Sequence, residues 1–153
     1  MKAAFAIAVV LLMAGCSAFG GSANASPAAS PKTTPLKPPS GSLDAEVPMP
    51  ANFPSDVPIY PGARLTAGQS FTSSGQQTWG MEWETLDDGA KVANFYTTKL
   101  NQGDWQITST TSPNGATAYT FVRKSNAHAS GTLGIDGSSG VTKISMSLVN
   151  PSS

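Results

Sequence analysis

The stretch WGMEWET, residues 79–85, decides the fold, because apolar and polar residues alternate strictly along it. Trp79, Met81 and Trp83 fall on one face of an extended chain, and the two glutamates fall on the other. Alternation of this kind predicts a half-buried strand of an antiparallel sheet. Residues 65–72 precede it through a turn at 73–76, which predicts a hairpin.

One helix and four further strands are predicted after this hairpin. The helix covers residues 88–101, and its apolar residues follow the i, i+3, i+4, i+8 spacing of one stripe: Val92, Phe95, Tyr96 and Leu100. Thr85 or Asp87 is expected to cap its start, and Gly103 is expected to end it. Alternation marks the strands at 105–109, 118–123, 133–135 and 144–148, with turns at 112–115 and 136–140. This order predicts an α+β fold, a curved antiparallel sheet of about six strands with one helix packed on one face.

The N-terminal residues have the form of an export signal. A lysine is followed by an apolar run over residues 3–14, which is shorter than the roughly 20 residues that a membrane-spanning helix needs. The run ends in Leu12-Met13-Ala14-Gly15-Cys16, and Cys16 is the single cysteine of the chain. This ending resembles the lipobox of bacterial lipoproteins, although Met13 stands where leucine is usual. The resemblance implies that residues 1–15 are a lipoprotein signal peptide and that Cys16 carries a diacylglyceryl group.

Two other interpretations of this segment stay open. Ala23-Asn24-Ala25 has the A-x-A form of an ordinary cleavage site, which predicts a soluble secreted protein that is cleaved after Ala25. Cys16 can also be an incidental apolar residue of the signal. Because an exported chain with one cysteine forms no internal disulfide, the lipid anchor is the favoured role of Cys16.

Composition divides the rest of the chain. Residues 16–52 are rich in Pro, Ala, Ser, Gly and Thr and poor in large apolar residues, so we predict a disordered linker after the lipidated Cys16. Residues 53–150 have the length and pattern of one globular domain, and residues 151–153 form a tail. Only 12% of the residues are charged and the formal net charge is +0, which argues against a nucleic-acid partner.

Two motifs of the predicted domain resemble a set of small bacterial envelope lipoproteins of unassigned function. One is P-x-Y-P-G-A at residues 58–63, and the other is V-x-x-F-Y-x-x-x-L at residues 92–100, on the helix that leads to Trp105. In those proteins a glycine stands directly before the tryptophan, whereas Asp104 separates Gly103 from Trp105 here. The resemblance implies the fold and an envelope location, and it brings no catalytic residues.

The first of these motifs also has a purely structural explanation. Pro58 and Pro61 fix the backbone φ angle, and Gly62 permits the turn that leads into the first strand. Ile59 and Tyr60 are expected to pack against the edge of the core. This explanation is favoured over a peptide-binding role, because proline-glycine turns are common.

No arrangement of residues predicts catalysis, a metal or a cofactor. His128 is the single histidine and lies in the polar stretch 125–130, without a second ligand or a G-x-S-x-G motif. The acidic cluster comprises Glu82, Glu84, Asp87 and Asp88. It lacks the spacing of a calcium loop, and we expect solvation and helix capping to account for all four carboxylates.

Aromatic residues are the weak candidates for ligand binding, because exposed rings stack on sugars or anchor a partner. The candidates are Trp79, Trp83, Trp105 and Tyr96. The favoured alternative is that most of these rings pack in the core, because a domain of this size needs large side chains to bury enough area.

These observations together predict a non-catalytic, lipid-anchored domain on the extracytoplasmic face of a bacterial membrane, inner or outer. It is expected to bind through the open sheet face or an edge strand, with the membrane and an envelope protein or glycan as partners. One alternative is a carrier for a small apolar or sugar ligand, which requires an apolar cavity of roughly a few hundred Å³ between helix and sheet. Another is an enzyme, which requires convergent carboxylates or His128 in a cleft.

Overall fold

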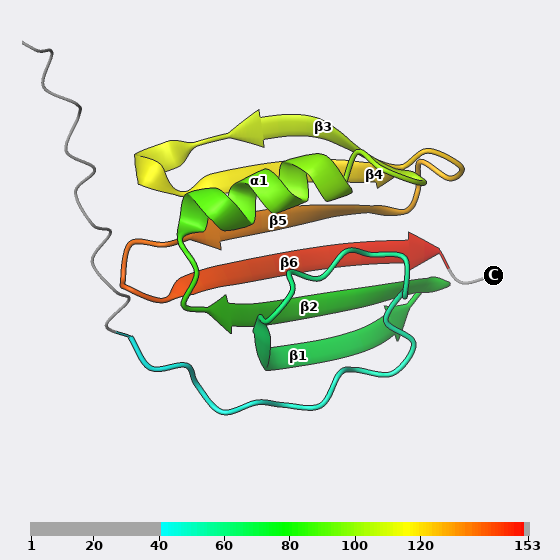
Figure 1. Ribbon diagram of the computed structural model, residues 1–153. Helices are drawn as coiled ribbons and strands as arrows, with labels where there is room; N and C mark the ends of the chain where they lie inside the picture. Colours follow the sequence, from blue (N-terminus) through cyan, green and yellow to red (C-terminus); the bar gives the residue numbers. More distant parts are fainter. Residues whose placement is uncertain (1–40, 152–153) are drawn as a thin grey trace, which may run out of the picture. The chain divides into compact units, whose positions relative to one another are not determined.

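The computed structural model describes residues 41–151 as one sheet with one α-helix on one face (Figure 1). The elements are β1 (Arg64–Ser73), β2 (Gln76–Thr85), α1 (Gly89–Lys99), β3 (Trp105–Thr111), the short 3-10 helix η1 (Pro113–Gly115), β4 (Thr117–Arg123), β5 (Ser130–Asp136) and β6 (Thr142–Pro151). The predicted α+β fold and its order of elements are confirmed. No helix in this part of the chain is long and apolar enough to cross a membrane.

The sheet is antiparallel throughout, with the strand order β1-β2-β6-β5-β4-β3. β6 is the last strand in sequence, yet it lies between β2 and β5 and joins the first hairpin to the other three strands. The two edge strands each contain a bulge, between Leu65 and Ala67 in β1 and between Ile107 and Ser109 in β3. Bulges increase local twist, which contributes to the curvature of the sheet.

α1 is capped by Asp88, which is neither of the two predicted cap residues. The Asp88 carboxylate accepts a hydrogen bond from the Ala90 N–H at 2.8 Å. Thr85 does not cap the helix because its hydroxyl accepts the N–H of Asp87 at 3.2 Å instead. At the other end, Gly103 has a φ of +69°, the left-handed conformation predicted for the turn that follows the helix.

The core lies on the inner face of the sheet, which is the face that α1 covers. The predicted alternation at 79–83 is confirmed, since its three apolar side chains are 1 to 4% exposed. α1 contributes Val92 and Tyr96, and its C-cap residue Leu100 joins them, each with 0% exposure. Phe95, the remaining residue of the predicted stripe, is only half-buried and packs against the chain that precedes β1.

An irregular segment covers the half of the inner face that α1 does not reach. We call residues 44–62 the cover segment. It follows the free edge of β1 and then crosses β2 and β6, whereas α1 lies over β4 and β5 (Figure 1). Phe53 of this segment meets the rings of Trp79 and Trp83 edge-on, with 6.1 Å between ring centroids in each pair.

The cover segment lies on both sides of the predicted domain boundary at residue 53. The Asp44 N–H donates to Glu84 at 2.8 Å, and the Val47 N–H donates to the Leu65 carbonyl at 2.9 Å. Few large apolar residues precede Phe53, but backbone hydrogen bonds to the sheet hold this stretch in place. At the C-terminal side, β6 extends to Pro151, one residue into the predicted tail. Residues 1–40, which include the predicted signal peptide and Cys16, lie outside the described residues.

The prediction for Ile59 and Tyr60 is half correct. Tyr60 is 5% exposed and belongs to the core cluster, whereas Ile59 is 37% exposed. Gly62 has a φ of +79°, which confirms the turn before β1. The Tyr60 N–H donates to the hydroxyl of Tyr96 at 3.2 Å, so the motif is fixed directly to α1.

Candidate functional site, a groove between α1 and the cover segment

A groove of about 330 Å³ opens where the end of the cover segment meets α1. Its lining residues come from three elements: Tyr60 and Pro61 from the cover segment, Asp87 from the β2–α1 connection, and Lys91 and Phe95 from α1. Lys91 and Phe95 are four residues apart, so they lie one above the other on the same face of the helix. The P-x-Y-P-G-A motif supplies the opposite wall.

One end of the groove is polar. The Tyr60 hydroxyl donates to Oδ2 of Asp87 at 2.6 Å, and Nζ of Lys91 lies 3.0 Å from the same oxygen. The hydrogen bond from Tyr60, followed by that from Lys91, lowers the pKa of the Asp87 carboxyl. The hydrogen bond to Asp87 raises the pKa of Lys91, and burial raises the pKa of Tyr60. At neutral pH this end therefore holds a phenol, a carboxylate and an ammonium group, and the Lys91 side chain is 66% exposed.

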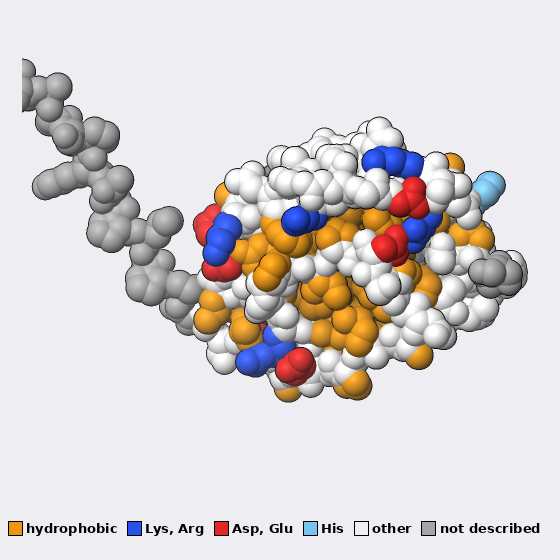
Figure 2. Space-filling model, turned by 45° about the vertical axis from the view of Figure 1, so that its right-hand side comes forward, with side chains coloured by type: hydrophobic (Ala, Val, Ile, Leu, Met, Phe, Trp, Pro, Cys, Tyr) orange, Lys and Arg blue, Asp and Glu red, His pale blue; other side chains and the backbone are white. Residues whose placement is uncertain are grey.

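The remainder of the groove is apolar. Phe95 packs edge-to-face on Tyr60 at 5.2 Å and on Tyr96 at 5.1 Å between ring centroids. Pro61 and the exposed Ile59 extend this surface along the cover segment. On this side of the molecule, hydrophobic side chains gather in one area that charged side chains border (Figure 2).

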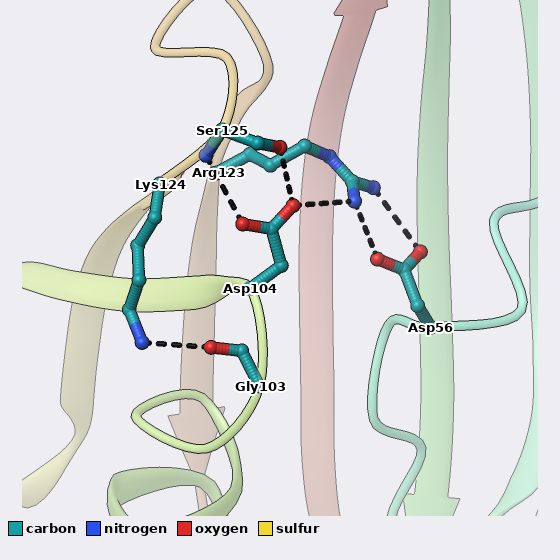
Figure 3. Close-up of polar contacts among 6 residues, drawn as sticks. All are labelled: Asp56, Gly103, Asp104, Arg123, Lys124 and Ser125. Atoms are coloured by element: carbon teal, nitrogen blue, oxygen red, sulfur yellow. Dashed lines mark hydrogen bonds and ion pairs between the residues drawn. The ribbon is translucent and has the colours of Figure 1, made fainter.

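An ion cluster fixes the cover segment at a second point. Arg123 of β4 donates from both terminal nitrogens to Asp56, at 2.6 and 3.1 Å, and from Nη1 to Asp104 at 3.2 Å (Figure 3). Its guanidinium also lies 4.3 Å from the centroid of the Trp105 ring. Asp104 additionally accepts hydrogen bonds from the backbone and hydroxyl of Ser125, and these bonds lower the pKa of its carboxyl. The cluster holds the cover segment over the sheet, and Asp104, which separates Gly103 from Trp105, takes part in it.

The four aromatic candidates from the sequence are all buried. Their exposed fractions do not exceed 2% at Trp79, Trp83, Trp105 and Tyr96. Trp79 donates from Nε1 to the carbonyl of Ala51 at 3.4 Å, and Tyr96 supports the groove from beneath through its contacts with Tyr60 and Phe95. These rings are core residues, as the favoured alternative held, and none of them presents a binding surface in the structure.

The space beneath the middle and the C-terminal end of α1 is filled by side chains. Val92, Leu100 and Phe121 are each 0% exposed, and Leu133 is 1% exposed. The groove is a surface feature and does not continue into this layer. No apolar carrier cavity therefore lies beneath this part of α1. At the start of the helix, a hollow of about 380 Å³ with polar and apolar lining opens between Gly89 and Ala90 on one side and Ile135 and Gly137 on the other.

The remaining sequence candidates do not converge on one site. His128 is exposed in the connection between β4 and β5. Glu84 corrects the expectation of a solvated carboxylate, because it is 2% exposed and accepts hydrogen bonds from Lys143 and from the backbone of Asp44, each at 2.8 Å. The hydrogen bond from Lys143 lowers the pKa of Glu84. Within residues 41–151, no three His, Cys, Asp or Glu side chains are grouped to hold a metal ion.

Sequence reasoning missed Lys91 and Pro61 as lining residues, and it assigned Asp87 only to capping. A signal for the ion pair was present, because Asp87 and Lys91 have the i, i+4 spacing that brings opposite charges together on a helix. Nothing in local periodicity showed that Tyr60 would lie against this pair. That contact spans 27 residues of sequence.

Comparison with known proteins gives one match. A family profile described as START domain-like matches residues 65–136, slightly less than half of the chain. The matched residues run from β1 to the end of β5 and leave out the cover segment and β6. A START-like domain indicates ligand binding without a clear catalytic role. Neither a search of curated proteins nor a search of solved structures found a significant match.

Proposed function

We propose that this chain is a lipid-anchored protein of the extracytoplasmic face of a bacterial membrane and that its folded domain binds a small ligand without transforming it. The groove between α1 and the cover segment is the binding site. The anchor rests on the lipobox-like sequence that ends at Cys16. The binding role rests on the START domain-like match together with the groove.

The chemistry of the groove defines the class of ligand. Phe95 and Pro61 offer apolar surface, and the ammonium group of Lys91 lies at one end of it. Because Asp87 already accepts hydrogen bonds from both Tyr60 and Lys91, its carboxylate attracts a further cation only weakly. The exposed Lys91 keeps donor protons free for an incoming anion. The groove thus fits a compact ligand with an apolar body and one anionic group.

The geometry does not favour a catalytic role for the same residues. A general base needs a pKa near the working pH, whereas the pKa of Asp87 is lowered and the pKa values of Tyr60 and Lys91 are raised. These shifts move all three pKa values further from neutral pH. Binding is therefore the activity that we propose for this site.

The binding proposal is tested with 8-anilinonaphthalene-1-sulfonate, a fluorescent aromatic anion. We expect the folded full-length protein to enhance its emission saturably, and Lys91→Gln to weaken binding by about tenfold, which corresponds to one lost charge contact. Lys99→Gln is the matched control, because Lys99 is an exposed lysine in the last turn of the same helix and does not line the groove. Equal affinity in the two variants, or no saturable binding, would reject the groove as the site.

The anchor is tested separately. Mass spectrometry of protein from its native membrane is expected to show a mature chain that begins at Cys16 and carries a diacylglyceryl group. A Cys16→Ser form is expected to leave the membrane fraction. An unmodified chain that begins at Ser26 in the culture fluid would establish ordinary secretion instead.

A further inference from the structure

The outer face of the sheet, opposite to α1, carries small polar side chains in rows. One row crosses five adjacent strands, because the strand registers place its members side by side: Gln69, Gly80, Ser147, Thr132 and Thr120. Hydroxyl and amide groups at this spacing both donate and accept hydrogen bonds. The row therefore presents a surface that is polar but uncharged.

A hollow of about 450 Å³ interrupts this surface where β1 and β2 meet. Gln69 and Gly80 are paired across the two strands, and Glu82 lies beside them on β2. The missing side chain of Gly80 opens the hollow. A Cβ placed on Gly80 would lie 3.6 Å from Nε2 of Gln69, so the Gln69 amide borders this space.

Phe71 stands next to the hollow. It is 57% exposed, more than any other large hydrophobic residue of the described chain. Phe71 is two residues from Gln69 on β1, so both side chains lie on the outer face, and its partner across the pair is Thr78. An exposed ring beside hydroxyl and amide groups offers an apolar face for stacking and polar groups for orientation.

The charges around the hollow select against ions. Two cations lie near the hollow. Lys143 is held by Glu82 at 3.0 Å and by the buried Glu84 at 2.8 Å. Arg64 pairs with Glu84 across β1 and β2 and donates to the Asp44 carbonyl at 3.1 Å. An anionic ligand would meet the Glu82 carboxylate, while Lys143 and Arg64 are already engaged by groups of the protein. Glu82 uses Oε1 for Lys143, which leaves Oε2 as an acceptor for hydroxyl groups.

From these observations we infer that the outer sheet face binds a neutral glycan chain, with one sugar ring stacked on Phe71 and the next seated over Gly80 between Gln69 and Glu82. Sugars match this surface because each ring has an apolar C–H face for the phenyl group and hydroxyls for the amide and carboxylate. The Glu82 carboxylate, together with the protein contacts of Lys143 and Arg64, favours a neutral polymer over an acidic one. This site is separate from the groove on the opposite face, and its test is independent of the groove.

The test uses the full chain in a polyoxyethylene detergent, which contains no sugar, and isothermal titration with cellohexaose and with chitohexaose. We expect a Kd of about 1 mM or tighter for at least one of the two, which is typical of a small, solvent-exposed contact. An oligogalacturonate of the same length is expected to bind at least about tenfold more weakly because of its carboxylates.

Two variants test the placement of the sugar, and one serves as a control. Phe71→Ala removes the exposed ring, and Gly80→Val fills the hollow with a side chain that β-strands accommodate well. Each is expected to weaken binding by at least about tenfold. Gly134→Val is the matched control. Gly134 lies in β5, a Cβ at this position would have no neighbouring atom within 4 Å, and the residue does not line the hollow.

Three results would overturn the inference. The first is no heat of binding with either neutral hexasaccharide. The second is a loss of affinity in Gly134→Val equal to that in Gly80→Val. The third is concentration-dependent self-association of the chain that Phe71→Ala abolishes, which would assign the exposed ring to contact with a second copy.

Discussion

The two halves of the inner sheet face are covered in different ways. α1 covers β4 and β5 and satisfies its own backbone hydrogen bonds, so its contribution to the core is a stripe of side chains. The cover segment lies over β2 and β6 with no regular structure of its own. Its backbone and polar groups therefore need partners elsewhere, and the sheet and α1 provide them.

The partners of the cover segment are spread along its whole length. Its polar attachments join Asp44 to Glu84, Val47 to Leu65, Ala51 to Trp79, Asp56 to Arg123, and Tyr60 to both Asp87 and Tyr96. The helix half thus depends on apolar packing and the other half on a series of specific polar contacts. The candidate groove lies where the two halves meet.

The largest effect is expected in the helix half. Leu100→Ala removes the fully buried side chain of the C-cap residue of α1 and leaves a cavity, which lowers the free energy of unfolding by about 2–5 kcal/mol. Urea denaturation followed by tryptophan fluorescence measures the loss. A loss below about 1 kcal/mol would show that α1 does not pack as closely as its burial indicates.

A smaller and more local effect is expected in the other half. Phe53→Ala removes the half-buried ring that packs on Trp79 and Trp83, which costs about 1–3 kcal/mol. Hydrogen exchange is expected to accelerate most at Val47 and Val57, whose N–H groups bond to Leu65 and Pro54, and little in α1. Uniform acceleration across the sheet and α1 would mean that the two halves unfold as a single unit.

Glu84 and Glu82 both bind Lys143, but only the buried Glu84 also binds the cover segment at Asp44. Glu84→Gln weakens the buried hydrogen bonds to Lys143 and to the Asp44 N–H. We expect it to lower the free energy of unfolding by about 1–3 kcal/mol. Glu82→Gln is the matched control, since Glu82 binds the same lysine with 36% of its side chain exposed and is expected to cost less. Equal losses in the two variants would show that the contact with Asp44 adds no stability.

The stability of the domain is expected to fall at acidic pH. The folded state lowers the pKa of Glu84, Asp87, Asp104 and Asp136 from ordinary values of 4.5 for the glutamate and 3.8 for the aspartates. Each carboxylate therefore stabilises the fold above its unfolded pKa, and this contribution is lost as the pH falls through the lower folded pKa. Urea midpoints between pH 7 and pH 2.5 should decrease below about pH 4.5, and less steeply for Glu84→Gln.

The smallest effect is expected at the exposed end of the cover segment. Asp56→Asn weakens the two bonds to Arg123, but Asp56 is 43% exposed and Arg123 keeps its contacts with Asp104 and Trp105. We expect a loss of at most about 1 kcal/mol, smaller still at high salt. A larger loss that salt does not change would indicate that this pair, and not the apolar contacts of Phe53, fixes the cover segment.

The strands and the helix could be predicted because their signals are local. Strict alternation at 79–85 and the apolar stripe from Val92 to Leu100 each follow from the geometry of one element. The helix cap shows where such reasoning fails by one residue. α1 begins at Gly89, so Asp88 caps it, whereas Asp87 binds Tyr60 and Lys91. The prediction that Glu84 is solvated fails for a related reason. Alternation shows which face of the sheet a side chain lies on, but it does not show which segment covers that face.

The amino-acid sequence by itself determined the order of the elements, the inner face of the sheet and the burial of its tryptophans, because these depend on periodicities of a few residues. Only the tertiary structure decided that β6 lies between β2 and β5, that residues 44–52 belong to the folded domain, and that Tyr60, Asp87 and Lys91 meet in one groove. These features depend on pairings between distant parts of the chain. Hydrogen-bonding groups of an irregular segment carry no periodic signal, so their partners become evident only when the chain is folded.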